Sequence, residues 1–161
     1  MSHYDVKAGL EKIDGFSVVG ISIVTDNEKA AEEINALWED FFKKQIGQKI
    51  ENRVDDVIYA VYSDYEGDHT KPYRYTIGYK IEGDPNISDD LHHVEVKEDN
   101  YAMMSAAGEQ PKALIETWTA IWQSDLDRRF ETDFEVYGQR FFEEGVHEVL
   151  VAIGVNLEEK Q

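Results

Sequence analysis

The same order of predicted elements occurs twice along the chain, and this repeat limits the folds open to it. A β-branched segment, an amphipathic helix with a central tryptophan and two further strand-like segments fall within residues 16–81, and the same order returns within residues 101–157. Trp38 and Trp118, one in each helix, are separated by 80 residues (118 minus 38). Duplicated units whose loops have changed length show such drifting offsets. We therefore predict a duplicated β-α-β-β unit and an α+β fold.

Two strand segments carry the repeat at similar offsets. Tyr-Ala-Val-Tyr at residues 59–62 matches Phe-Glu-Val-Tyr at residues 134–137, a separation of 75 residues (134 minus 59). Thr-Ile-Gly at residues 76–78 matches Ala-Ile-Gly at residues 152–154, a separation of 76 residues (152 minus 76). We interpret these matches as an old duplication.

The length of 161 residues fits one domain. We predict a single domain over residues 1–161, with repeat halves at about 6–82 and 93–157. Hydrophobic residues make up 42% of the chain and aromatic residues 12%, which is enough for a packed core and argues against disorder.

Local signals place the individual elements. Thr25 followed by Glu28 matches a capping box, which predicts that the first helix begins there, and it should end near Gly47. Pro111 is expected in the first turn of the second helix. The second and third predicted strands should form a hairpin with a long loop. Strands are predicted at residues 16–24, 57–62, 73–81, 94–97, 101–107, 132–137 and 146–155.

The charge balance narrows the partners of the chain. With 34 acidic and 16 basic residues, the formal charge is −18, which repels phosphate backbones and raises the local concentration of cations. There is no basic stripe, so we expect no direct binding to nucleic acid. The sequence also lacks cysteine, a signal peptide and any segment long and apolar enough for a membrane span. We therefore expect a cytoplasmic protein without membrane contact.

The strand predicted at residues 132–137 places a carboxylate among aromatic side chains. Side chains alternate between the two faces of a strand, so Phe134 and Val136 share one face, which we expect to meet the helices. Glu135 and Tyr137 point to the other face. In the first repeat Tyr62 takes the corresponding orientation, which predicts that Tyr62, Glu135 and Tyr137 line a shared central groove.

A carboxylate in such a setting suits an organic cation. Burial disfavours the charged form of the carboxyl and raises its pKa, and a bound cation restores the missing partner. Aromatic faces add about 0.5–2 kcal/mol for each cation–π contact. The alternative is that Glu135 is a solvated residue on an edge strand, and the spacing alone favours this alternative.

The same residues resemble a known family. Glu-Val-Tyr at residues 135–137 follows a tryptophan-bearing helix and precedes Glu-Val-Leu-Val-Ala-Ile at residues 148–153, within a duplicated layout. This pattern resembles the GyrI-like effector-binding domain family, which includes the ligand-binding modules of AraC-type and MerR-type multidrug regulators, gyrase-inhibitory proteins and stand-alone integron-cassette proteins. The resemblance covers about residues 6–157. It implies a pseudo-twofold pair of antiparallel sheets, with helices on one side and a ligand cleft between the halves.

The resemblance also implies which residues bind the ligand. The acidic residue of the family, which contacts bound cationic drugs, falls at Glu135, and His147 replaces a tyrosine often found in the last strand. The pocket aromatics implied by the family fall at Tyr59, Tyr62, Trp118, Trp122 and Tyr137. Without the resemblance, tryptophans on apolar helix faces are more often core residues than ligand platforms. The strand faces that Tyr73, Tyr75 and Tyr79 occupy stay open.

Three functions remain after this comparison. We expect a stand-alone module that binds small, hydrophobic, cationic and aromatic compounds, without cofactor. One alternative is a hydrolase of reactive electrophilic natural products that uses Glu135, and another is an acidic inhibitor of the gyrase-inhibitor type that acts on a protein partner. No helix-turn-helix is predicted, so regulation would require a DNA-binding partner, and otherwise the protein sequesters its ligand.

We expect no metal site. The loop at residues 84–95 imitates a calcium-binding loop but lacks glycine at its sixth position. His92 and His93 are adjacent and point apart on a strand, so they cannot bind one metal ion together.

Overall fold

A computed structural model of the chain describes residues 9–67, 71–83, 91–109, 112–123, 128–138, 141–143 and 147–155. The first repeat contains β1 (Gly9–Ile13), β2 (Phe16–Thr25), α1 (Ala30–Lys43), a 3-10 helix η1 (Ile46–Lys49), β3 (Arg53–Ser63) and β4 (Tyr73–Ile81). The second repeat contains β5 (His92–Val96), β6 (Asp99–Ala106), α2 (Lys112–Trp122), β7 (Arg128–Tyr137) and β8 (Val149–Val155). None of the described helices is long and apolar enough to cross a membrane.

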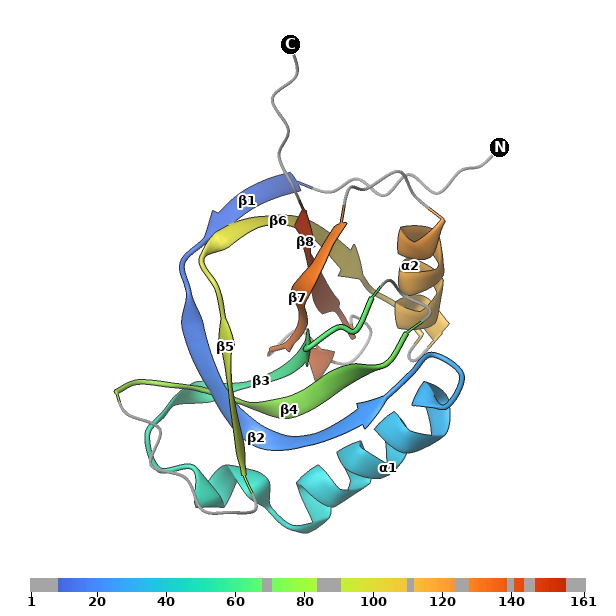
Figure 1. Ribbon diagram of the computed structural model, residues 1–161. Helices are drawn as coiled ribbons and strands as arrows, with labels where there is room; N and C mark the ends of the chain where they lie inside the picture. The colour runs from blue at the N-terminus through green and yellow to red at the C-terminus, as the bar shows by residue number, and fades with distance from the viewer. Residues whose placement is uncertain are drawn as a thin grey trace.

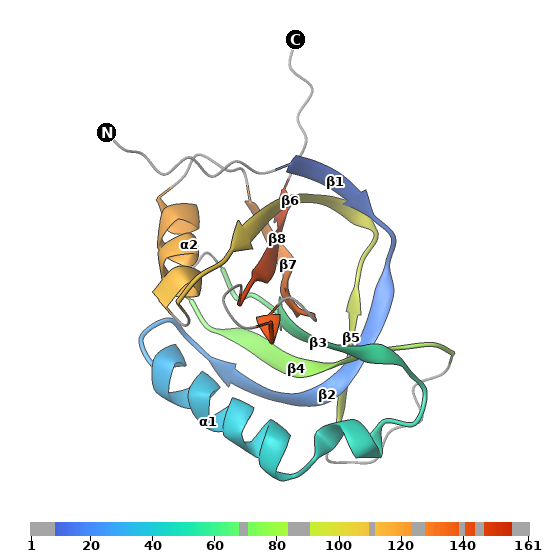
Figure 2. The same cartoon turned by 180° about the vertical axis from the view of Figure 1, so that it is seen from behind.

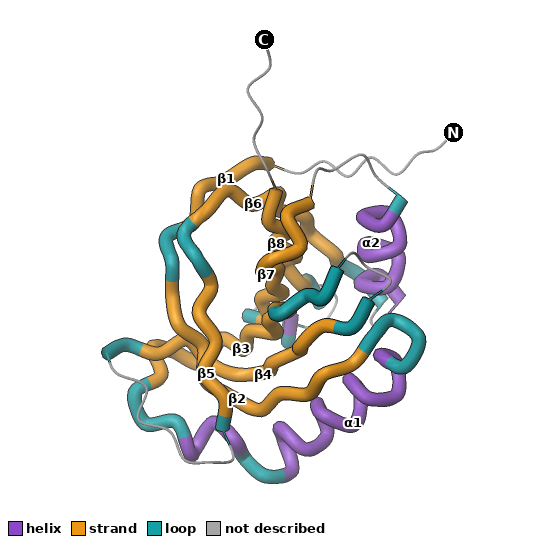
Figure 3. The backbone as a smooth tube through the Cα atoms, viewed as in Figure 1, coloured by secondary structure: helices purple, strands orange, loops and turns teal. Residues whose placement is uncertain are grey.

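The strands form one curled antiparallel sheet in the order β1-β6-β8-β7-β3-β4-β2-β5. Figures 1 and 2 show the curl, with α1 running along β2 and α2 standing beside the end of β6. The tube in Figure 3 shows the same arrangement, with the strands in orange and the helices in purple. The predicted α+β fold and the hairpin of β3 and β4 are confirmed.

Both predicted ends of the first helix need correction. The first helix begins at Ala30, because Thr25 is the buried last residue of β2 and a turn from Asp26 to Lys29 separates it from the helix. The N-cap residue, Lys29, makes no capping hydrogen bond with its side chain. In this turn, Oδ1 of Asp26 accepts hydrogen bonds from the backbone N–H groups of Glu28 at 3.0 Å and Lys29 at 3.1 Å.

The same helix ends at Lys43, before Gly47, because Gln45 adopts a left-handed conformation with φ of 51° and the chain continues as η1. Strand β1 was not predicted, because its short polar sequence has no strand pattern and its pairing with β6 defines it. Pro111 and most of the loop at residues 84–95 lie outside the described residues.

The hydrogen-bond register shows a pseudo-twofold relationship between the repeats. In the centre of the sheet Ala60 pairs with Glu135, and these two residues are 75 apart (135 minus 60), the offset predicted for their strands. The outer partners differ from the prediction. Arg53 of β3 pairs with Ile81 of β4, and the corresponding Arg128 of β7 pairs with Val155 of β8; each pair lies beside a register shift. Ile81 and Val155 therefore occupy corresponding positions, which gives an offset of 74 between β4 and β8 (155 minus 81). The offset of 76 inferred from the glycines is therefore wrong by two residues, which leaves the facing of the side chains unchanged.

The edge strands are exchanged between the repeats. β1 leads directly into β2 but pairs with β6, whereas β5 leads into β6 but pairs with β2. Each repeat thus extends the sheet of the other, which joins the two halves into one body.

The backbones of the paired strands β2 and β4 approach closely at one point. Gly20 pairs with Gly78, and a Cβ atom at Gly20 would lie 1.8 Å from the carbonyl oxygen of Ile77. Only glycine permits this approach of the two backbones.

Two apolar cores lie on the two faces of the sheet. Leu37 and Phe41 of α1 and Trp118 and Ile121 of α2 belong to the same core as Ala60, so both helices cover one face. Phe134 belongs to the core of the opposite face, with Val136 packed against it, so our expectation that this pair meets the helices is wrong. The period of two assigned residues to common faces correctly, but it does not tell which face the helices cover.

Candidate ligand-binding site

A cavity of about 700 Å³ lies between the two helices and the sheet. Its walls are mainly aromatic and aliphatic, and all three tryptophans of the chain contribute to them. The lining residues on the helix side are Ala30, Ala31, Ile34, Asn35, Trp38, Phe42, Leu114, Ile115, Trp118 and Trp122. Those from the strands and connecting segments are Asn27, Tyr62, Tyr65, Tyr73, Tyr75, Arg128, Glu135, Tyr137, Phe141, Phe142 and Val149.

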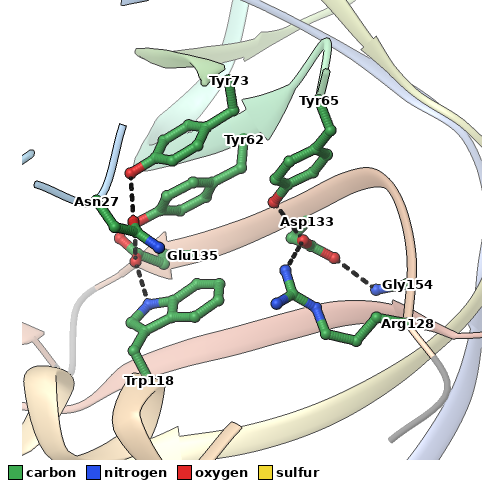
Figure 4. A network of polar contacts seen from close by, with 9 residues as sticks. All are labelled: Asn27, Tyr62, Tyr65, Tyr73, Trp118, Arg128, Asp133, Glu135 and Gly154. Atoms are coloured by element: carbon green, nitrogen blue, oxygen red, sulfur yellow. Dashed lines mark hydrogen bonds and ion pairs between the residues drawn. The ribbon is translucent and has the colours of Figure 1, made fainter. Parts of the chain in front are cut away.

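Glu135 occupies the centre of the sheet wall of the cavity and is only 1% exposed. Three neutral groups donate hydrogen bonds to its carboxylate. Tyr137 donates its hydroxyl to Oε1 at 2.6 Å, and Tyr62 donates its hydroxyl to Oε2 at 2.8 Å. The indole Nε1 of Trp118 donates to Oε2 at 2.8 Å. Figure 4 shows Tyr62 and Trp118 reaching Glu135 from opposite sides.

Burial controls the charge state of this carboxyl. Removal from water raises the pKa of Glu135 above its ordinary value, although the hydrogen bonds from Tyr137, Tyr62 and Trp118 each lower it. Among the described residues, no ion pair with Glu135 is recorded. The site therefore holds an acidic group whose negative charge is stabilised by dipoles alone.

A second buried carboxylate beside the cavity is neutralised within the protein. Asp133 forms an ion pair with Arg128 at 2.8 Å, and the side chains are 0% and 6% exposed, respectively. Asp133 also accepts hydrogen bonds from the hydroxyl of Tyr65 and, at 2.8 Å, from the backbone N–H of Gly154 (Figure 4). The guanidinium of Arg128 lies 5.7 Å from the ring centroid of Trp118. Asp133 therefore has a fixed structural cation, in contrast to Glu135.

Aromatic side chains pack around the carboxylate from both repeats. The ring of Tyr62 lies 5.0 Å from that of Trp118, and the ring of Trp38 lies 4.9 Å from that of Tyr137. Toward solvent the walls become exposed, with Trp122 38% and Phe142 57% exposed. These two side chains mark the rim of the cavity.

The structure brings together five of the seven residues predicted for the site. Glu135, Tyr62, Tyr137, Trp118 and Trp122 all line the cavity.

Tyr59 and His147 do not line it, and both placements correct our expectation. Tyr59 points to the other face of the sheet and packs against Phe16 and Phe134. The reason is that adjacent residues of a strand point to opposite faces, and its neighbour Ala60 belongs to the core under the helices. His147 precedes β8 with φ of 44°, and its Nδ1 lies 2.9 Å from the carbonyl oxygen of Phe141. Val149, two residues later, takes the lining position.

Sequence reasoning missed Trp38 and left Tyr73 and Tyr75 unassigned. Trp38 corresponds to Trp118 in the repeat, and this symmetry was the available signal. Tyr73 and Tyr75 line the cavity from one face of β4, whereas Tyr79 stacks on Phe41. The roles of Arg128 and Asp133 had no sequence signal, since their pairing depends on the fold.

Comparison with known proteins places this geometry in a family. A family model described as Cass2, integron-associated effector binding protein, matches residues 9–153. The curated protein YobU of Bacillus subtilis (strain 168), whose name assigns it provisionally to the transcriptional regulators, is 30% identical over 127 residues, covering 74% of this chain and 79% of YobU.

Solved structures share the fold. The integron cassette protein VCH_CASS2 from the mobile metagenome of Vibrio cholerae is 24% identical, with a TM-score of 0.71 over 93% of this chain and 97% of its own. The structure of SAV2435 bound to tetraphenylphosphonium is 16% identical, with a TM-score of 0.76 over 93% of this chain and 94% of its own.

Proposed function

The chain belongs to the Cass2 family of integron-associated effector-binding proteins, and on this basis we propose that its effectors are hydrophobic organic cations held against Glu135. A buried carboxylate in an aromatic cavity supports the preference for cations. The ligand enters between α1 and α2 and replaces water on the aromatic walls.

The buried charge of Glu135 carries the proposal. A carboxylate has about four lone-pair positions, and the three recorded donors leave one on Oε1. Each donor is neutral, so the negative charge stays uncompensated in a medium of low dielectric constant, where an unpaired charge is costly. A cation in the cavity supplies the counter-charge without moving the protein groups.

The walls favour a broad set of flat or propeller-shaped cations. Tyr62, Trp38 and Trp122 line the cavity, and the faces of aromatic rings attract cations through their quadrupoles. A volume of about 700 Å³ is in the range of small-molecule pockets. Tetraphenylphosphonium, the ligand of the similar fold SAV2435, has this chemistry. The formal charge of −18 further concentrates cations near the protein.

A matched pair of ions tests the proposal. Tetraphenylphosphonium and tetraphenylborate have nearly the same shape and opposite charge, so their affinities separate charge recognition from apolar packing. Binding is measured by calorimetry and by quenching of the tryptophans, all three of which line the cavity.

We expect the phosphonium ion to bind at least ~10-fold more tightly, and Glu135→Gln to remove most of this preference. Gln keeps the shape of the side chain, and its amide oxygen can still accept from Trp118. Equal binding of the two ions to the unmodified protein, or an unchanged preference in Glu135→Gln, contradicts the proposal.

The raised pKa of Glu135 favours a second candidate function, hydrolysis of a reactive electrophile. A carboxylate whose pKa moves toward neutrality is a better general base for activating water. Incubation with strained epoxides, followed by mass spectrometry for addition of water, tests this candidate. Catalytic turnover that stops in Glu135→Gln supports the hydrolase, and a rate equal to the buffer blank in the unmodified protein contradicts it.

A further inference from the structure

The tyrosine hydroxyl groups around the cavity differ in how they use their protons. Tyr62 and Tyr137 donate to Glu135, and Tyr73 donates to Oδ1 of Asn27 at 2.9 Å. Tyr65 donates to Asp133. In each of these side chains the hydroxyl proton is bound to an acceptor of the protein.

Tyr75 is the exception among the cavity tyrosines that the structure describes. Its hydroxyl oxygen accepts a hydrogen bond of 2.9 Å from Nε1 of Trp38, and no acceptor for its own proton is recorded. The side chain is 1% exposed and lines the cavity from β4. Buried hydroxyl groups normally satisfy their donor as well as their acceptor, since an unused buried donor costs free energy.

The indole of Trp38 fixes the direction of this donor. A phenol proton lies near the plane of the ring, and the indole N–H already occupies one side of the oxygen. The ring of Tyr62, at 5.0 Å and 75°, packs against Tyr75 and restricts its rotation. The hydroxyl is therefore a buried, oriented donor in a wall that is mainly aromatic and aliphatic.

We propose that Tyr75 forms a second polar subsite, which donates a hydrogen bond to an acceptor on the bound effector. This inference rests on the proposed function and narrows it. The preferred effectors are hydrophobic cations that also carry a carbonyl, ether or similar acceptor, with the positive charge at Glu135 and the acceptor at Tyr75.

Corresponding tryptophans of the two repeats contact the two polar groups, although Glu135 on β7 and Tyr75 on β4 lie on strands that do not correspond in the repeat. Trp38 and Trp118 occupy corresponding helices, and each donates its indole N–H to a polar group of the sheet. Trp118 holds Glu135, which only accepts hydrogen bonds when ionised, whereas Trp38 holds Tyr75, which can donate. One repeat thus provides the anionic subsite and the other provides the donor subsite.

Matched probes separate the donor subsite from the charge subsite. (4-Acetylphenyl)triphenylphosphonium and (4-isopropylphenyl)triphenylphosphonium have the same charge and similar shape, and only the first carries an acceptor. The 3-substituted isomers form a second pair, which presents the acceptor in another direction. Affinities are measured by calorimetry for the unmodified protein, Tyr75→Phe and the control Tyr73→Phe, whose hydroxyl already donates to Asn27.

In at least one of the two pairs, we expect Tyr75→Phe to lower the affinity for the acetyl probe about 3- to 10-fold more than the affinity for its isopropyl partner. Tyr73→Phe should affect the two members of each pair equally. If Tyr75→Phe melts at a much lower temperature, Trp38→Phe, which leaves the hydroxyl present but not oriented, should reduce the same difference between the probes.

Equal effects of Tyr75→Phe on the acetyl and isopropyl probes in both pairs overturn the donor subsite. This outcome is distinct from failure of the proposed function, which is measured by the preference for tetraphenylphosphonium over tetraphenylborate. Both proposals are supported if Tyr75→Phe loses the extra affinity for the acetyl probes and still prefers tetraphenylphosphonium to tetraphenylborate.

Discussion

Nε1 of Trp118 lies 2.8 Å from Oε2 of Glu135, so the helix α2 and the central strand β7 meet in a hydrogen bond at the cavity wall. Glu135 pairs with Ala60 at the centre of the pseudo-twofold arrangement. The only carboxylate that lines the described cavity therefore lies where the two repeats meet, within reach of tyrosines from both. This position makes the carboxylate accessible to a ligand held between the two helices.

Cation binding should depend on pH. Burial raises the pKa of Glu135, so at low pH the carboxyl is protonated and offers no counter-charge. The affinity for tetraphenylphosphonium should rise as pH increases through this raised pKa and then level off. Calorimetry from pH 4.5 to 8.5 measures the profile, and Glu135→Gln should be nearly flat over the same range. Parallel profiles for both proteins would assign the pH dependence to other groups.

The stability of the ligand-free protein should show the opposite trend. The pKa of Glu135 is higher in the folded state than in the unfolded chain, so the folded state binds the proton more tightly. The stabilisation that comes from this proton is complete below the pKa of the unfolded chain, about 4.3, and is lost as pH rises through the pKa of the folded state.

Glu135→Gln should therefore melt about 2–4 °C higher than the unmodified protein at pH 8, since the buried charge is removed, and this advantage should disappear near pH 4. Differential scanning fluorimetry or calorimetry of the two proteins side by side measures the difference. A difference in melting temperature that is the same at every pH would show that titration of Glu135 does not cause the pH dependence of stability.

The ion pair between Arg128 and Asp133 should matter far more than its counterpart in the first repeat. Asp133→Asn removes the fully buried carboxylate of this ion pair and should cost about 3–5 kcal/mol of unfolding free energy. Arg53 corresponds to Arg128, but its pair with Asp56 is 35% and 92% exposed. Asp56→Asn should therefore change stability by less than about 0.5 kcal/mol. Urea unfolding of both variants checks this contrast, and similar costs would refute it.

Neighbouring tyrosines of β3 should have different effects on ligand binding. Tyr62→Phe removes a donor to Glu135, so it should raise the pKa of Glu135 further and move the pH profile of binding upward. At a given pH on the rising part of that profile, the affinity for tetraphenylphosphonium should therefore fall. Tyr59→Phe alters only the opposite face and should leave both quantities unchanged. A loss of affinity in Tyr59→Phe equal to that in Tyr62→Phe would contradict the assignment of faces.

Alternation along β3 and β7 was enough to predict that Tyr62, Glu135 and Tyr137 share a face. This worked because the period of two is set by the sterics of the extended backbone and needs no knowledge of the fold. The same argument separates Tyr59 from Tyr62. Tyr59 entered the predicted site through the family resemblance, and the alternation of its own strand excludes it.

Other parts of the site needed the folded chain. The exchange of β1 and β5 joins the two repeats through pairings between segments far apart in sequence, and β1 has no pattern that reveals it. The pairing of Arg128 with Asp133 depends on the register shift at the start of β7. The orientation of the Tyr75 hydroxyl depends on the hydrogen bond from Trp38, which α1 brings against β4.

The sequence by itself determined the repeated elements, the residues that share a strand face and the candidate carboxylate, because periodicity and local turns act over a few residues. The tertiary structure decided which face the helices cover, and thereby left Phe134 in the second core and Glu135 in the cavity. It also decided that Asp133 has a cation while Glu135 has only neutral donors. The physical reason is that desolvation and ion pairing depend on groups brought together from distant strands, which no local pattern encodes.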